Sequence, residues 1–234
     1  MIQVCLNGQR GTGDSTAVPM SPEAMAESAA RAVAAGAADV HVHPKTPCGD
    51  DSMSPRVVAA VVTAVRDAVD VPVGVTTGAW AEPDPARRVE RVRSWTVLPD
   101  HASVNWDEAG AEELAAALMA RGVGVEAGIR SGTDGARRFL ASPLAPRVVR
   151  VLAEVTDPDP ATAGATARSL LAELGTAHGI PVLLHGEDGG AWPVLRLALR
   201  LGLDTRVGLE DTLFLPDGRP ADSNSQLVAA ARTP

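Results

Sequence analysis

The stretch Ala35-Gly36-Ala37-Ala38-Asp39-Val40-His41-Val42-His43-Pro44 joins the end of a helix to a short strand that carries two histidines. Gly36 stands where the helix should stop, because glycine readily adopts the conformation that ends helices. Side chains at positions i and i+2 of a strand point to the same face, so His41 and His43 can present both imidazoles to one point. Such a pair either binds a metal ion or consists of two ordinary, half-buried histidines, and the rest of the chain has to decide.

The alternation of helix and strand continues along the whole chain, where short apolar runs separate longer Ala-rich amphipathic segments. The predicted strands span residues 2–6, 39–43, 73–77, 102–105, 123–127, 148–151, 181–184 and 205–209. The predicted helices span residues 21–34, 55–69, 85–94, 108–120, 134–141, 162–174, 192–201 and 223–232. Eight such units predict an α/β protein with the (β/α)8 fold of a TIM barrel, formed by residues 1–234 as a single domain; an open, doubly wound sheet is the alternative.

The composition fits such a barrel and excludes several classes of protein. The chain has 234 residues, a length that one large α/β domain can reach, and 45% of them are hydrophobic while only 3% are aromatic. Small and branched aliphatic residues must therefore form the core, as they do where parallel strands pack under Ala-rich helices. The formal net charge of −8, without a long basic run, argues against a nucleic-acid partner.

The N-terminus predicts a cytoplasmic protein. It lacks a basic start and an apolar stretch of about 18 residues, so we expect neither a signal peptide nor contact with a membrane. The two cysteines, Cys5 and Cys48, are too few for a disulfide framework. We expect Cys5 to be buried in a strand and Cys48 to point away from the histidine pair, because two prolines constrain its loop.

In a barrel of this kind the catalytic groups lie at the carboxyl ends of the strands and in the loops that follow. Polar side chains collect at these positions: Asn7, His41, His43, Thr76, Thr77, Ser103, Asn105, Glu126, His185, Glu187, Glu210 and Asp211. Loops after strands are polar in any case, but His41, Ser103 and Glu126 fall within predicted strands and need another explanation. We interpret the collection as an active site at one mouth of the barrel.

The histidine pair supplies two of the three protein ligands that a zinc centre in this site would need. A catalytic zinc ion takes three protein ligands and keeps one position open for substrate or water. Glu210 is the best third ligand, because the last strand brings it to the same mouth of the barrel as His41 and His43. Glu126 is the next candidate.

Six motifs follow one another along the chain. They are Leu6-Asn7-Gly8, Val18-Pro19-Met20-Ser21-Pro22-Glu23, Ala35-Gly36-Ala37 leading to His41-Val42-His43, Thr76-Thr77-Gly78, Arg206-Val207-Gly208-Leu209-Glu210-Asp211 and Ser223-Asn224-Ser225-Gln226-Leu227-Val228. In this order they resemble the β-keto acid cleavage enzymes, whose type member is the 3-keto-5-aminohexanoate cleavage enzyme. The resemblance extends from the first predicted strand to the last predicted helix, and the motifs are specific in combination.

The resemblance implies a zinc-dependent transferase that performs a Claisen-type exchange between a β-keto acid and acetyl-CoA, giving acetoacetate and a new acyl-CoA. It implies His41, His43 and Glu210 as the zinc ligands. It also implies Asp211 as the acid/base group, Arg206 as the residue that orients it, and a family carboxylate at Glu126.

The substrate side of the site is expected at Thr76, Thr77, Gly78, Ser103 and Asn105, and Thr76 falls at a family Ser/Thr position beside the substrate. The habit of the family also implies a homo-oligomer, a tetramer. The chain departs from the family after its second histidine, where Pro44 and Lys45 replace an apolar residue and arginine.

Three other readings stay open. Lys45, the only lysine of the chain, could form a Schiff base in a metal-free aldolase, although a loop after Pro44 is expected to be solvated and a nucleophilic lysine needs a dry pocket. The barrel could also be a metal-dependent lyase, aldolase or hydrolase acting on another keto acid, or a binding protein that holds a metal without catalysis.

The remaining histidines divide between the two ends of the barrel. His101 and His178 precede predicted strands, at the end that serves stability, and we expect both on the surface. His185 and Glu187 follow the seventh predicted strand, where they either line the substrate pocket or cap the next helix.

Overall fold

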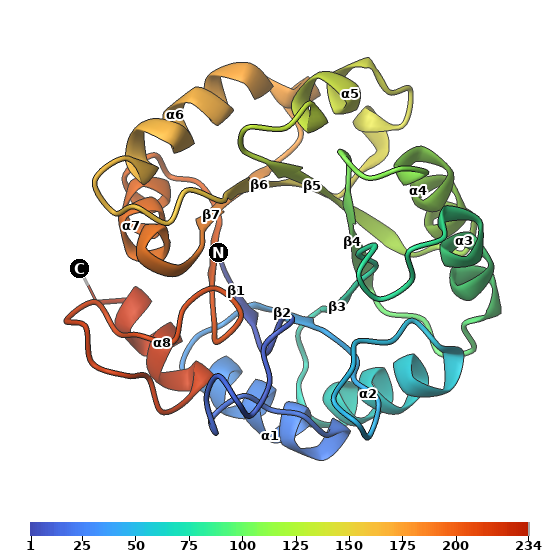
Figure 1. Ribbon diagram of the computed structural model, residues 1–234, viewed down its shortest axis with the longest axis horizontal. Helices are drawn as coiled ribbons and strands as arrows, with labels where there is room; N and C mark the ends of the chain where they lie inside the picture. The colour runs from blue at the N-terminus through green and yellow to red at the C-terminus, as the bar shows by residue number, and fades with distance from the viewer. Residues whose placement is uncertain (234) are drawn as a thin grey trace.

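Eight parallel strands form one curved sheet that closes into a ring in the computed structural model, which describes residues 1–233 (Figure 1). The strands are β1 (Ile2–Cys5), β2 (Asp39–Val42), β3 (Val73–Thr76), β4 (His101–Asn105), β5 (Gly124–Arg130), β6 (Arg150–Val155), β7 (Val182–Gly186) and β8 (Thr205–Val207). Their order in the sheet is β7-β6-β5-β4-β3-β2-β1-β8. A parallel bridge between Leu183 and Asp204 brings β8 back to β7, so the sheet is a barrel and the open-sheet alternative is wrong.

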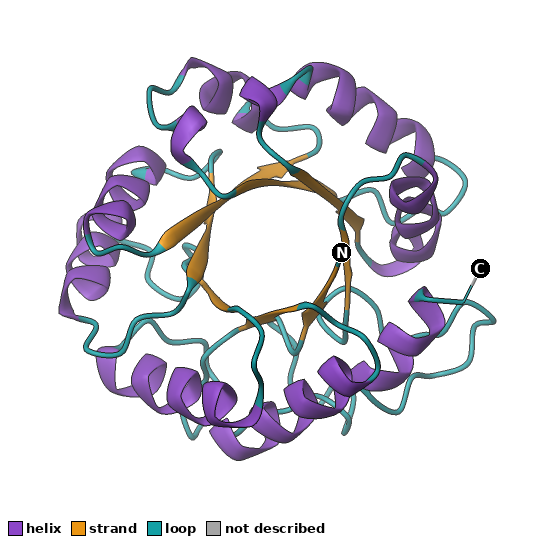
Figure 2. Ribbon diagram, turned by 180° about the vertical axis from the view of Figure 1, so that it is seen from behind, coloured by secondary structure: helices purple, strands orange, loops and turns teal. Residues whose placement is uncertain are grey.

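Eight α-helices cover the outside of the ring (Figures 1 and 2). They are α1 (Pro22–Ala34), α2 (Pro55–Ala68), α3 (Pro85–Ser94), α4 (Ala111–Ala120), α5 (Gly135–Ala141), α6 (Ala163–Leu174), α7 (Ala191–Arg200) and α8 (Asn224–Ala231). Local sequence determines where several helices begin. The hydroxyls of Ser21 and Ser54 accept hydrogen bonds from backbone N–H groups in the first turns of α1 and α2, and a proline follows each serine.

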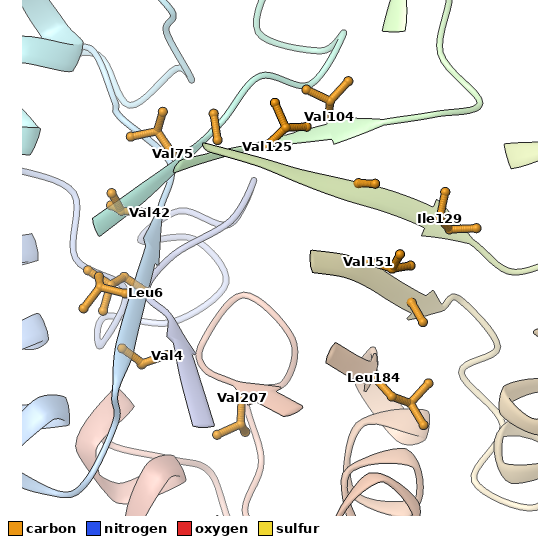
Figure 3. Close-up of a cluster of buried hydrophobic side chains, with 14 of the residues drawn as sticks. Val4, Leu6, Val42, Val75, Val104, Val125, Ile129, Val151, Leu184 and Val207 are labelled. Carbon is orange, nitrogen blue, oxygen red and sulfur yellow. The ribbon is translucent and has the colours of Figure 1, made fainter. Parts of the chain in front are cut away.

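Side chains along each strand point alternately toward the helices and toward the barrel axis. The outward ones are apolar and form the main core between sheet and helices, as Figure 3 shows for Val4, Val42 and Val207. Their neighbours Gln3 and His41 face inward and are buried although they are polar. The interior of this barrel is therefore unusually polar, and its charges need partners.

The eight predicted units are all present, and most predicted boundaries lie within two residues of the observed ones. The carboxyl ends of three strands were placed too early: β5, β6 and β7 continue two to four residues beyond their predicted ends at residues 127, 151 and 184. Each of these extensions contains an inward-facing polar residue, Arg130, Glu154 or His185, which a search for apolar runs does not count. Cys5 is buried in β1, as predicted, and Cys48 is exposed.

Polar side chains fill the amino-terminal end of the barrel interior, and we name them the floor cluster: Gln3, Asp39, His101, Glu126 and Arg150. His101 Nε2 lies 3.0 Å from Asp39 Oδ1, and its Nδ1 lies 3.1 Å from Glu126 Oε2. Arg150 contacts the same two carboxylates, with its Nε 2.8 Å from Glu126 Oε1. Gln3 donates to both as well. The floor cluster thus sets two carboxylates against one guanidinium and one imidazole.

The prediction that His101 lies on the surface was wrong, since only 4% of the residue is exposed. Gly74 makes room for it: a Cβ at this position would lie 2.0 Å from Cε1 of the His101 ring. Burial alone would lower the pKa of His101, but the carboxylates of Glu126 and Asp39 outweigh it and raise the pKa to about 10. His178, by contrast, is exposed as predicted.

We expect the stability of the metal-free protein to depend on His101 at alkaline pH. Because the folded pKa is raised, the stabilisation is complete below the unfolded value of about 6.5 and disappears as pH rises through about 10. The full effect is at most roughly 5 kcal/mol of unfolding free energy. Chemical denaturation between pH 6 and 11 should therefore show a steeper loss of stability for the wild-type chain than for His101→Gln, while the exposed-site control His178→Gln follows the wild type. Equal pH slopes for wild type and His101→Gln would contradict this account.

Candidate active site

Two histidines and one carboxylate converge at the carboxyl end of the barrel. His41 lies in β2, His43 follows it directly, and Glu210 lies in the loop after β8. Glu210 Oε2 is 3.9 Å from His41 Nε2, and Glu210 Oε1 is 3.5 Å from His43 Nε2. One ligand atom from each residue can be chosen so that all three lie within 4.8 Å of one another. Because zinc lies about 2 Å from nitrogen and oxygen ligands, one ion can contact all three.

Two further observations indicate that this cluster fits a metal ion. Glu210 Oε2 is buried and has no hydrogen-bond partner within residues 1–233. Gly8 leaves the space that the Glu210 side chain occupies, since a Cβ there would lie 2.5 Å from Glu210 Cγ. Two imidazoles and a carboxylate are a donor set typical of catalytic zinc.

The protein environment gives the three groups different charges. Burial lowers the pKa of His41 to about 4, so this imidazole is neutral and ready to bind a metal. Burial also lowers the pKa of His43, but Glu210 and Asp51 outweigh it and raise the pKa to about 9. Arg206 and the two histidines overcome the effect of burial on Glu210 and hold its pKa well below the usual range.

Arg206 connects Glu210 to Asp211. Its Nη2 lies 2.9 Å from Glu210 Oε1 and 2.8 Å from Asp211 Oδ1. Burial would raise the pKa of Asp211, but Arg206 and His185 keep it below its usual value, so the carboxylate is ionised. Asp211 Oδ2 is buried and, among the described residues 1–233, has no hydrogen-bond partner. Gly208 allows the loop after β8 to lie against the backbone of β1, because a Cβ at this position would lie 1.9 Å from the carbonyl oxygen of Cys5.

A cavity of about 450 Å³ opens beside the three candidate ligands. Of the residues predicted on the substrate side, Thr76, Ser103 and Asn105 line it. Thr77 does not: its hydroxyl donates to the carbonyl of Ser103 at 2.6 Å. Gly78 does not line it either, because the Trp80 ring lies over it. Arg206 lines the cavity, whereas Asp211 lies behind it.

Glu126 lies below the candidate ligands and does not line the cavity. Its Oε2 is 4.0 Å from His41 Nδ1, on the side of the ring away from Glu210. Its other contacts are with the floor cluster, and His101 and Arg150 hold its pKa low against the effect of burial. The geometry therefore favours Glu210 over Glu126 as the third ligand.

Comparison with known proteins identifies the family. The profile of the family described as beta-keto acid cleavage enzyme matches residues 1–234. The chain belongs to this family. The search of curated proteins found no match. None of the helices in residues 1–233 is long and apolar enough to span a membrane.

Solved structures with the same fold are distant in sequence from this β-keto acid cleavage enzyme family member. A type I 3-dehydroquinate dehydratase from Clostridium difficile has a TM-score of 0.65 and 12% identity, over 98% of this chain and 90% of that one. An N-acetylmannosamine-6-phosphate 2-epimerase from Clostridium perfringens has a TM-score of 0.57 and 16% identity, over 90% and 87%. At such identities the likeness supports the barrel fold alone.

The family member also carries cavity residues that the sequence patterns did not reveal. Trp80, Arg130 and Glu154 line the cavity. Glu187 lines it too, which agrees with the first of its two predicted roles, lining the substrate pocket or capping the next helix. Burial and the neighbouring Glu187 raise the pKa of Glu154 well above its usual value. The alternation of inward positions in β6, had it been continued past residue 151, would have included Glu154.

Two expectations need correction. His185 lies within β7, is fully buried and does not line the cavity; its Nδ1 accepts from Arg206 Nε at 3.2 Å. Lys45 is not solvated, since only 4% of the residue is exposed. Its ammonium forms an ion pair with Asp51, a contact that the sequence analysis did not predict.

Proposed function

We propose that this chain is a zinc-dependent enzyme that exchanges a β-keto acid with acetyl-CoA, giving acetoacetate and a new acyl-CoA. One observation carries the proposal: His41, His43 and Glu210 converge on one point beside a polar cavity in a β-keto acid cleavage enzyme family member. We further propose a cytoplasmic homo-oligomer, a tetramer, as the family resemblance implies.

The residues divide the chemistry between them. His41, His43 and Glu210 hold the ion. Zinc, when bound, supplies a Lewis acid that polarises the keto carbonyl and neutralises developing negative charge. Thr76, Ser103 and Asn105 line the same cavity from β3 and β4 and offer hydrogen bonds to substrate oxygens.

Asp211 is the proposed acid/base group, and Arg206 keeps it ionised. Arg206 lines the cavity and holds Asp211 Oδ1 behind it, so the proposal requires the guanidinium to move toward the carboxylate of the substrate and open a path from the cavity to Asp211. Glu126, whose Oε2 lies 4.0 Å from His41 Nδ1, does not line the cavity, so the proposal gives it no contact with the substrate.

The contacts of Lys45 disfavour the Schiff-base alternative. Its ammonium is buried, lies 2.5 Å from Asp51 Oδ1, donates to the carbonyl of Gly8 and does not line the cavity. A nucleophilic lysine has to reach the substrate, and Lys45 is held on Asp51 outside the cavity.

The proposed function is tested by metal analysis of the purified chain together with a screen of β-keto acids against acetyl-CoA. We expect about one zinc per chain and acetoacetate that forms only when both substrates are present. Removing the metal with a chelator should abolish acetoacetate formation, and added zinc should restore it. Formation of acetoacetate that survives complete metal removal, or a zinc-loaded chain that forms none from any β-keto acid, would overturn the proposal.

A further inference from the structure

One carboxylate outside the ligand set is bound to a candidate ligand. Asp51 Oδ2 accepts from His43 Nδ1 at 3.0 Å and from Trp80 Nε1 at 2.9 Å. Asp51 Oδ1 accepts from Lys45 Nζ at 2.5 Å. Only 6% of the Asp51 side chain is exposed. Both of its oxygens are therefore occupied, and the carboxylate has little freedom to turn.

The loop that carries Asp51 is itself held in place. Lys45 and Asp51 form an antiparallel bridge, and Ser52 donates its backbone N–H to the carbonyl of Pro44 at 2.8 Å. Lys45 also donates to the carbonyl of Gly8 at 2.8 Å, which ties the loop to the segment after β1. The position of Asp51 relative to His43 is thus set by the backbone as well as by the side chains.

We propose that Asp51 is a positioning residue for the metal ligand His43. By accepting a hydrogen bond from Nδ1 it fixes the ring and aims Nε2, the atom that faces Glu210, at the position of the ion. Trp80 packs along the same ring from the cavity side, with ring centroids 5.8 Å apart and an interplanar angle of 11°. Lys45 is part of this device, because its ammonium holds the second oxygen of Asp51.

The inference rests on the metal site of the proposed function, and it is tested by zinc affinity without turnover. Zinc is titrated into the metal-free full chain against a chromophoric chelator. We expect Asp51→Asn to weaken zinc binding about 10- to 100-fold, as removal of such partners does elsewhere. The matched control is Asp50→Asn, which removes the neighbouring but exposed carboxylate and should leave the affinity unchanged.

A second variant separates position from charge. Asp51→Glu keeps the negative charge but displaces the carboxylate, so a positioning role predicts affinity about 5-fold weaker or more, whereas a purely electrostatic role predicts no change. The visible spectrum of the cobalt-substituted chain should shift in both Asp51 variants, because the coordination of the ion changes. If Asp51→Asn does not fold, Asp51→Glu decides.

The outcomes distinguish this inference from the proposed function. Zinc affinity at the wild-type value in Asp51→Glu, with an unchanged cobalt spectrum, overturns the role of Asp51 and leaves the enzymatic proposal intact. A wild-type chain that binds zinc through the Asp51-dependent site but forms no acetoacetate overturns the function and leaves the role of Asp51 intact. A wild-type chain that binds no zinc overturns both.

Discussion

His41→Ala is expected to purify without zinc and to lose at least about 1,000-fold in kcat/KM for acetoacetate formation. His41 is a fully enclosed neutral imidazole, and no other side chain within residues 1–233 is placed to replace its Nε2 beside Glu210. Loss of a ligand should cost more zinc affinity than the roughly 100-fold that loss of a supporting hydrogen bond can cost. Metal content and steady-state kinetics of the same preparation measure both effects.

His178→Ala is the matched control, because it removes an exposed histidine at the other end of the barrel. It should keep the zinc content and the activity of the wild type. Wild-type zinc content in His41→Ala, together with more than a tenth of the activity, would contradict the assignment of the metal site.

Asp211→Asn is expected to retain zinc and to lose about 100- to 10,000-fold in kcat/KM, the range that removal of a general acid or base gives. The amide keeps the shape of the side chain and can still accept from Arg206, but it cannot take up a proton at the position of Oδ2. Zinc affinity within about threefold of the wild type separates this loss from that of His41→Ala.

Asp217→Asn provides the control for Asp211→Asn, since Asp217 is an exposed carboxylate later in the same segment of the chain. Its kcat/KM should match the wild type. Activity of Asp211→Asn within threefold of the wild type would assign Asp211 to holding Arg206 and would remove it from the proton transfer.

The sequence predicts the barrel and the three candidate ligands for related reasons. The short apolar runs contain the strand residues that face the helices, and the amphipathic segments contain the helix residues that pack on them. Together these residues form the main core. His41 and His43 share a strand face, and the parallel arrangement brings Glu210 to the same mouth. Each of these inferences needs only local spacing and the topology of the fold.

What the sequence does not predict depends on contacts between distant residues. The buried state of His101 requires Asp39 and Glu126, which lie on two other strands. The ends of β5, β6 and β7 were missed because these strands run on to the inward-facing polar residues Arg130, Glu154 and His185, which a search for apolar runs does not count. Spacing likewise gave no sign that the loop after His43 folds back and brings Asp51 to it.

The floor cluster has a consequence for redesign of this barrel. The negative charges of its two carboxylates balance the positive charges of the guanidinium and the imidazole. Removing any one of these groups leaves an unpaired charge in the interior, which costs about 3–5 kcal/mol of unfolding free energy. Exchanging the members together for apolar side chains of similar volume avoids that cost. Libraries that vary these positions one at a time will therefore recover mostly destabilised chains, and the floor cluster has to be varied as one unit, whereas the residues at the mouth of the barrel can be varied separately.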